Sequence, residues 1–185
     1  MNDKNTKRIS KDQWLDCALT ALENGGIENV RVDKLARQLG VARSGFYWHF
    51  KDRQDLLSHM LKYWAYEYTE VVTQNKLLTE GPAIQRLENV MRTVRDYGLS
   101  RYEAAIFIWA QSDPAARETF DRAFEKRVQF IGNMFAELGF EGDEKEMRAQ
   151  FFIGYLAWEY TDFIPQSKAK QNRLLKLRLE LLTKK

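Results

Sequence analysis

The 185-residue sequence contains few residues of the kinds that mark secreted, membrane-bound or disordered proteins. Its single cysteine, Cys17, excludes an internal disulfide and a cysteine-based zinc site, and it favours a reducing, cytoplasmic location. Three prolines are too few for a linker-rich chain. No apolar run approaches the roughly 18 residues of a membrane span, and no apolar segment follows the charged first ten residues. We therefore expect neither a transmembrane helix nor a signal peptide.

Groups that carry out catalysis are also scarce. The chain has two histidines, no glycine-rich phosphate loop and no evident pairing of a nucleophile with a base. His59 follows Asp55 by one helical turn, a spacing that could hold a metal, but no third ligand accompanies the pair. We therefore expect no enzyme, no metal and no cofactor, and we interpret His59 as a surface or interface residue.

What the sequence does contain is apolar residues at helical intervals along its whole length. Ser10 and Gln13 have the spacing of a capping box at the start of the first helix. Asp52 is the expected N-cap of a long helix, and Gly81-Pro82 is the clearest helix breaker. The pattern predicts an all-α fold of about nine helices and no strand. The expected helices cover residues 10–24, 32–39, 42–49, 52–76, 82–98, 104–110, 114–138, 143–163 and 168–183.

Residues 104–110 form the most apolar of these segments. A helix that is hydrophobic all round is normally buried all round. We therefore expect this segment at the centre of the larger, C-terminal half of the protein.

Residues 31–50 have the pattern of two short helices joined by a tight turn at Gly40, a residue that tolerates positive φ. If Phe46 and Phe50 face a small three-helix core, the helical period directs Arg43 and Tyr47 outward. A DNA major groove, about 12 Å wide, admits one such helix. The segment therefore predicts a helix-turn-helix that binds DNA.

Each candidate contact has a chemical reason. Arg43 can reach guanine or a phosphate, and the small Ser44-Gly45 pair would let the backbone approach the duplex closely. Lys51 and Arg53 lie at the start of the next helix, where side-chain charge and free backbone N–H groups both favour phosphate. The candidate DNA-binding residues are Arg31, Arg43, Ser44, Gly45, Tyr47, His49, Lys51 and Arg53.

Three aromatic side chains in this segment have competing interpretations. For Trp48 we favour packing against the long helix, whereas for Tyr47 we favour a phosphate contact because Phe46 and Phe50 already occupy the buried face. His49 is either a phosphate donor or a structural cap, and the sequence leaves this choice open.

The run Gly40-Val41-Ala42-Arg43-Ser44-Gly45-Phe46-Tyr47-Trp48-His49-Phe50-Lys51-Asp52, followed by Asp55-Leu56-Leu57, resembles the signature of the TetR (tetracycline repressor-like) family. The resemblance covers residues 8–57, which we expect to form the DNA-binding domain, with the helix-turn-helix at about 31–50. Residues 58–185 would form a helical effector-binding and dimerisation domain. The resemblance implies a homodimeric repressor that leaves a roughly palindromic operator in double-stranded DNA when a small molecule binds.

The sequence departs from that family at two positions. Arg31 stands where members usually have Ser or Thr as a cap and phosphate ligand, so a neighbour such as Asn29 is an alternative cap. Gly45 stands where a side chain often contacts a base, so Arg43 and Ser44 would carry more of the specificity.

The C-terminal part offers two further sets of candidates. Aromatic residues there could line an effector pocket, although aromatic stripes at helical spacing are more often simply core. The pocket candidates are Trp64, Tyr68, Phe107, Trp109, Phe130 and Tyr155. The last two helices have apolar faces that suit a four-helix interface between two chains, or else complete the core of one chain. The candidates for a dimer interface are Phe151, Gly154, Trp158, Leu175, Leu179 and Leu182.

From the sequence we therefore expect a ligand-responsive, DNA-binding transcription repressor. The effector would shift the population of the protein toward a state in which the long helix at 52–76 has moved. The main alternative is a DNA-bound adaptor that recruits a protein partner and has no small-molecule effector.

Overall fold

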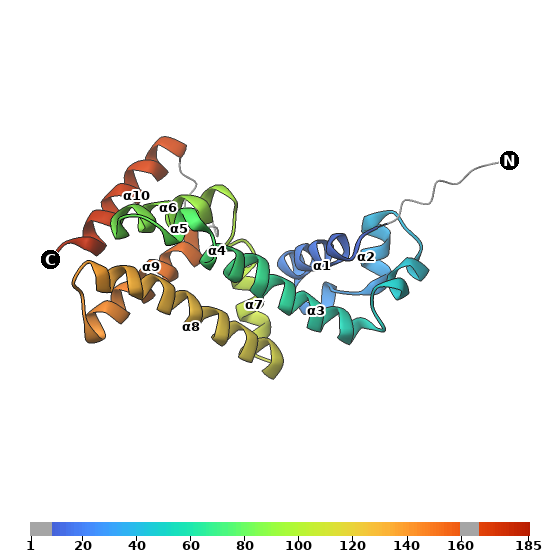
Figure 1. Cartoon of the computed structure of the whole chain (residues 1–185). Helices are drawn as coiled ribbons and strands as arrows, with labels where there is room; N and C mark the ends of the chain where they lie inside the picture. Colours follow the sequence, from blue (N-terminus) through green and yellow to red (C-terminus); the bar gives the residue numbers. More distant parts are fainter. Residues whose placement is uncertain (1–8, 160–166) are drawn as a thin grey trace. The chain divides into compact units, whose positions relative to one another are not determined.

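In the computed structural model, which describes residues 9–159 and 167–185, every regular element is a helix (Figure 1). The prediction of an all-α fold is therefore confirmed. The chain divides into two compact units, one made of Met1–Trp64 with Ala105–Thr119 and the other of Ala65–Ala104 with Phe120–Lys185. The functional boundary between residues 57 and 58 stays a prediction.

The N-terminal unit follows the predicted order of short helices. It contains α1 (Lys11–Gly25), the 3-10 helix η1 (Ile27–Asn29), α2 (Val32–Leu39), the 3-10 helix η2 (Arg43–Trp48) and α3 (Arg53–Ala65). The capping box is present, because Ser10 Oγ accepts from the Gln13 N–H and Gln13 Oε1 accepts from the Ser10 N–H. The third helix is a 3-10 helix of six residues, and the poor helix propensity of Ser44-Gly45 is a physical reason for so short an element.

The segment expected to form a long helix at 52–76 contains three consecutive helical elements that differ in winding. Asp52 caps it as predicted, since its Oδ1 accepts from the Asp55 N–H at 2.8 Å. After α3 the chain forms a π-helical turn, η3 (Tyr66–Glu70), and then α4 (Val71–Thr73). The Val71 N–H bonds to the carbonyl of Tyr66, five residues back. Apolar spacing does not reveal such a single wide turn, so the sequence did not predict it.

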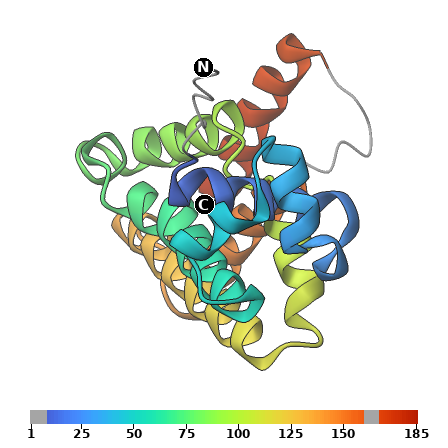
Figure 2. The ribbon, with the colours of Figure 1, turned by 90° about the vertical axis from the view of Figure 1, so that its right-hand side faces the viewer.

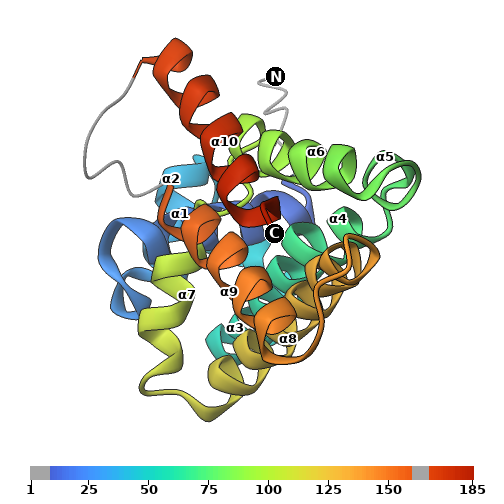
Figure 3. The same cartoon turned by 90° about the vertical axis from the view of Figure 1, so that its left-hand side faces the viewer.

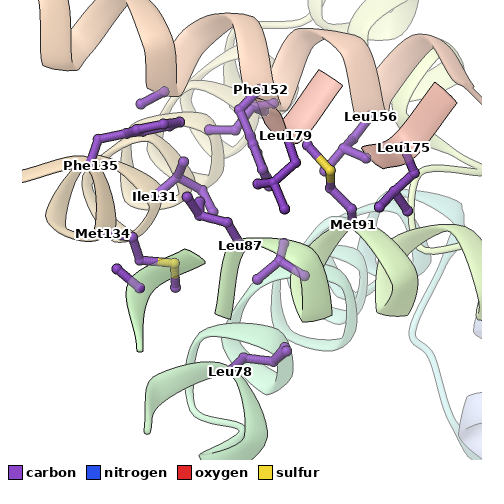
Figure 4. Packing of buried hydrophobic residues seen from close by; sticks show 14 of the residues in the cluster. Leu78, Leu87, Met91, Ile131, Met134, Phe135, Phe152, Leu156, Leu175 and Leu179 are labelled. Carbon is purple, nitrogen blue, oxygen red and sulfur yellow. The ribbon is translucent and has the colours of Figure 1, made fainter. Parts of the chain in front are cut away.

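The C-terminal unit packs its remaining helices around one core (Figure 4). These helices are α5 (Lys76–Thr79), α6 (Ala83–Asp96), the part of α8 (Pro114–Glu137) from Phe120 onward, α9 (Gly142–Glu159) and α10 (Lys168–Thr183). The short α5, capped by Asn75 Oδ1, was not predicted. α10 lies against α6, as the view in Figure 3 shows. The predicted end of the ninth helix at 160–163 lies outside the described residues.

The expectation for residues 104–110 is wrong. In α7 (Glu103–Ala110), Ile106 and Trp109 are buried, but Phe107 is 46% exposed and Ile108 is 68% exposed. Residues 105–110 also belong to the N-terminal unit. One buried face is enough to hold an eight-residue helix, and a uniformly apolar segment carries no period that would identify that face.

Three of the leucines expected at a subunit interface instead lie in the core of the chain. Leu175 and Leu179 are buried among residues of α6 and α9, and Leu182 packs against the same cluster. The competing interpretation, in which α10 completes the core of one chain, therefore holds for these three residues. The side chain of Trp158 lies outside the described residues.

Candidate nucleic-acid interface

The turn between α2 and η2 is made by Gly40, which has the predicted left-handed conformation with φ of 69°. The Gly40 N–H bonds to the carbonyls of Ala36 and Arg37, and the Val41 N–H bonds to that of Ala36 at 3.0 Å. These hydrogen bonds close the end of α2 and turn the chain directly into η2. α2 and η2 consequently pack against each other in the N-terminal unit (Figure 2).

One side of η2 is anchored in an aromatic core. Phe46 is fully buried, with its ring edge-on to Trp14 at 5.5 Å between centroids and tilted against Phe50 at 5.2 Å. Such ring pairs add to the stabilisation from burial. This packing fixes the rotation of η2 and determines which of its side chains face solvent.

The opposite side carries the residues predicted to meet DNA. Arg43 and Ser44 are exposed, and Tyr47 is 52% exposed. Arg43 Nη2 donates a hydrogen bond to Tyr47 Oη at 3.0 Å, and the guanidinium carbon lies 5.9 Å from the centre of the Tyr47 ring. The two side chains thus support each other at the surface and present a cation beside a hydroxyl.

Trp48 is the residue that the sequence interpretation misplaced. Its side chain is 87% exposed and does not pack in the core. Phe46 and Phe50 already fill the buried side of this short element, so no space is left there for an indole. Trp48 therefore joins the exposed surface of η2, and the pair of buried phenylalanines was the signal that could have indicated this.

Gly45 has open space around it. A Cβ built on Gly45 would have no atom within 4 Å, and the backbone does not adopt a positive φ. The fold of this chain therefore does not require a glycine there.

The start of α3 differs from the expected arrangement. Lys51 is exposed, but its backbone N–H donates to Asp55 Oδ2 at 2.9 Å, and the Asp55 N–H is capped by Asp52. The hydrogen bond from Lys51 is the main reason that the pKa of Asp55 lies below its ordinary value. Carboxylates therefore already occupy the backbone N–H groups of Lys51 and Asp55, whereas the side chain of Lys51 remains exposed.

Two of the candidate residues are held by backbone carbonyls. Arg53 Nε donates to the carbonyl of Val30 and Arg53 Nη2 to that of Ile27, both at 2.7 Å. His49 Nε2 lies 2.9 Å from the carbonyl oxygen of Ile9. Both side chains thereby connect segments of the unit that are distant in sequence. For His49 this contact corresponds to the structural alternative, rather than the phosphate donor, of the two roles considered from the sequence.

Arg31 is an exposed residue at the N-cap position of α2 and makes no side-chain cap there. Its Nε lies 3.3 Å from Asp33 Oδ1. Desolvation raises the pKa of Asp33, but the charge of Arg31 and hydrogen bonds from Arg31 and the backbone together hold it below its ordinary value. The alternative cap, Asn29, instead accepts from Lys34 Nζ at 2.7 Å. Neither residue caps α2 in the way that Ser or Thr would.

A cavity lies inside the C-terminal unit, and two of the six pocket candidates line it. Tyr68 contributes from η3 and Phe130 from α8, together with apolar residues of α4, α6 and α9. About 60 Å³ of the cavity is open to the centres of water molecules.

The other four candidates lie elsewhere. Trp64 and Trp109 are buried and belong to the N-terminal unit, which also contains the half-exposed Phe107. Tyr155 lies toward the surface of α9, with the guanidinium of Arg178 3.5 Å from its ring centre. The helical spacing of these aromatic residues did not indicate which of their side chains face the cavity.

Two further features bear on the class of protein. Among residues 9–159 and 167–185, no three His, Cys, Asp or Glu side chains gather closely enough to hold a metal ion. Within the same ranges, no helix combines the length and apolar character that crossing a bilayer requires.

Residues 15–60 match the family described as bacterial regulatory proteins, tetR family. The chain is also similar to the HTH-type transcriptional regulator AcrR of Shigella flexneri, with 33% identity over 57 residues. That match covers 31% of this chain and 26% of AcrR, so it spans about a quarter of the length of the relative.

Solved structures match over nearly the whole chain at low identity. A transcriptional regulator from Rhodococcus sp. Rha1 has a TM-score of 0.70 at 16% identity, with 95% of this chain and 94% of that chain covered. AibR, in complex with isovaleryl coenzyme A and operator DNA, has a TM-score of 0.70 at 18% identity, with 94% and 97% covered. These likenesses establish a common fold. The match to the tetR family of bacterial regulatory proteins covers residues 15–60, the part of the chain that contains α2 and η2.

Proposed function

We propose that this chain is a transcription regulator that binds specific sequences in double-stranded DNA. The observation that carries the proposal is the two-sided character of η2, in which Phe46 is fully buried while Arg43, Ser44 and Tyr47 are exposed. Because packing on its buried side holds η2 in place, the exposed side chains can contact base edges with little further loss of conformational entropy on binding. Arg43 would contact guanine or phosphate, and Lys51 would contact phosphate.

We further propose that the regulator works as a homodimer through α9 and α10. Apart from the three core leucines, the large apolar residues that are exposed on the described parts of these helices are Met147, Phe151 and Tyr155 on α9 and Leu177 and Leu181 on α10. A Cβ at Gly154 would have no atom within 4 Å, so a partner helix can approach closely. A second copy would present the same patch, as a two-fold interface requires.

The cavity supports an effector-controlled repressor over the adaptor that was the main alternative. It adjoins η3 and α4, which continue the helix that begins with α3 in the N-terminal unit. A small molecule that binds more tightly to one position of this helix shifts the protein toward that position and away from the DNA-bound state. AibR, which has the same fold, is a protein whose structure contains both an acyl-coenzyme A and operator DNA.

Selection of bound duplexes from a random pool tests the DNA-binding proposal. We expect an inverted repeat with half-sites about 34–36 Å apart, one turn of DNA. Recovery of no enriched motif would reject sequence-specific binding, and a single unrepeated half-site would reject the dimer. Sedimentation of the free protein measures the dimer independently.

A further inference from the structure

The cavity of the C-terminal unit is lined mainly by apolar side chains. The apolar lining includes Val72, Val90, Leu99, Phe130, Phe152 and Leu156. Besides the hydroxyl residues Thr73 and Ser100, the polar lining consists of a hydrogen-bonded group made of Thr69 of η3, Glu103 of α7 and Arg127 of α8. A cavity of this kind recognises a mainly apolar molecule and orients it by a few polar contacts.

Arg127 is held by the protein at each of its three guanidinium nitrogens. Its Nε donates to Thr69 Oγ1 at 2.9 Å, its Nη1 to Glu103 Oε1 at 2.7 Å and its Nη2 to the carbonyl of Tyr68 at 3.2 Å. Two of these acceptors belong to the π-helical turn η3, so this turn positions the guanidinium. Each guanidinium nitrogen therefore has an acceptor already, and the positive charge faces the carboxylate of Glu103.

Glu103 is engaged through only one of its two oxygens. Its side chain is 7% exposed, and Oε2 is a buried atom that accepts no hydrogen bond from the described residues. A buried acceptor without a donor is costly and uncommon in folded proteins. Because Glu103 lines the cavity, a molecule inside it can supply the missing donor.

Charge and space then limit the kind of molecule. Arg127 and Glu103 neutralise each other, so a cation would add a net charge at a buried site, and an anion would meet the carboxylate. A volume of about 60 Å³ accommodates a few atoms rather than a long chain. We infer that this cavity binds a small, uncharged, mainly apolar molecule whose single N–H or O–H group donates a hydrogen bond to Glu103 Oε2.

Binding of such a molecule to the cavity needs no DNA and can be measured by itself. Only its effect on DNA binding rests on the proposed function. Its test compares three five-membered rings on the purified chain. Pyrrole has an N–H donor, furan has the same shape without a donor, and pyrrolidine is a protonated cation at pH 7. Binding is measured from chemical-shift changes of backbone amides near Thr69 and Glu103 in NMR titrations.

We expect pyrrole to bind at least tenfold more tightly than furan and more tightly than pyrrolidinium. The variant Glu103→Gln retains an oxygen for Arg127 but places an NH₂ group at the position of Oε2, so the preference for pyrrole over furan should disappear. Glu125→Gln, the same change at an exposed position of α8, should leave the preference intact.

Equal binding of pyrrole and furan by the unaltered chain would overturn the inference even if Glu103→Gln failed to fold. Tighter binding of pyrrolidinium would overturn the requirement for an uncharged ligand. If the protein selects a DNA motif but binds pyrrole and furan equally, the inference about the cavity is rejected and the proposed function stands. If it prefers pyrrole but selects no DNA motif, the proposed function is rejected and the inference about the cavity stands.

Discussion

Gly45→Ala separates the stability of the N-terminal unit from its binding to DNA. The added methyl group meets no atom within 4 Å in the free chain, and no positive φ opposes it. Replacement of glycine at such a compatible position stabilises a protein by about 0.4–1 kcal/mol, because the unfolded chain loses freedom. We therefore expect the free energy of unfolding of the variant to equal or exceed that of the parent.

In the complex with DNA the same methyl group would stand between η2 and the floor of the groove, if Ser44-Gly45 is the point of closest approach. Extra atoms in a close-packed contact cost about 1–3 kcal/mol, which corresponds to a loss of roughly 5- to 150-fold in affinity. Urea denaturation measures the stability, and fluorescence anisotropy with the selected duplex measures the affinity.

The expected result is a variant that is at least as stable and binds DNA more weakly. Unchanged affinity for the selected duplex would refute the close approach at Gly45. Lower stability in the absence of DNA would contradict the open surroundings of this position. Ser44→Ala removes the neighbouring hydroxyl without adding volume, so it tests the contact of Ser44 separately from the space at Gly45.

Five other changes test the remaining roles. Arg43→Ala should cost about 1–3 kcal/mol on the selected duplex and blur its base preference, and equal losses on selected and random DNA would reject base reading. Lys51→Ala should weaken binding to all duplexes alike and reduce the slope of log affinity against log salt by about 1. Arg53→Ala removes hydrogen bonds to two carbonyls, so it should lower the free energy of unfolding by about 1.5–3 kcal/mol. Leu181→Glu should give monomers in sedimentation with the helical content retained, because Leu181 is exposed in the single chain, and a persistent dimer would place the interface elsewhere. The pKa of Asp55 is lowered in the folded chain, so the carboxylate stabilises the fold above its unfolded pKa, and this effect is lost as pH falls through the folded pKa. Asp55→Asn should therefore flatten the acid side of the plot of unfolding free energy against pH. An unchanged plot would contradict the Lys51–Asp55 contact.

Signals that act over a few residues allowed correct prediction of most helix ends. Ser10 and Gln13 begin α1, Gly40 ends α2, and Asp52 caps α3, each because a side chain or a permitted φ satisfies backbone groups close in sequence. The outward direction of Arg43 followed from the same local logic, once Phe46 was assigned to the core.

The errors arose where a decision depends on distant neighbours. Phe46 and Phe50 lie close to Trp48 in sequence, but it is their packing with the distant Trp14 that leaves Trp48 no space in the core. The leucines of α10 form a wide apolar face, and only the packing of α6 and α9 decides that Leu175 is core while Leu181 faces solvent.

The amino-acid order by itself thus determined the all-helical class, the turn at Gly40 and the caps at Ser10 and Asp52, because all of these depend on periodicity and on contacts within one or two turns. Only the tertiary structure decided that Arg53 and His49 bind carbonyls, that four of six aromatic residues lie away from the cavity, and that Glu103 keeps a buried oxygen without a donor. These features depend on which segments meet in space, and burial and hydrogen bonding between distant segments leave no periodic trace in the sequence.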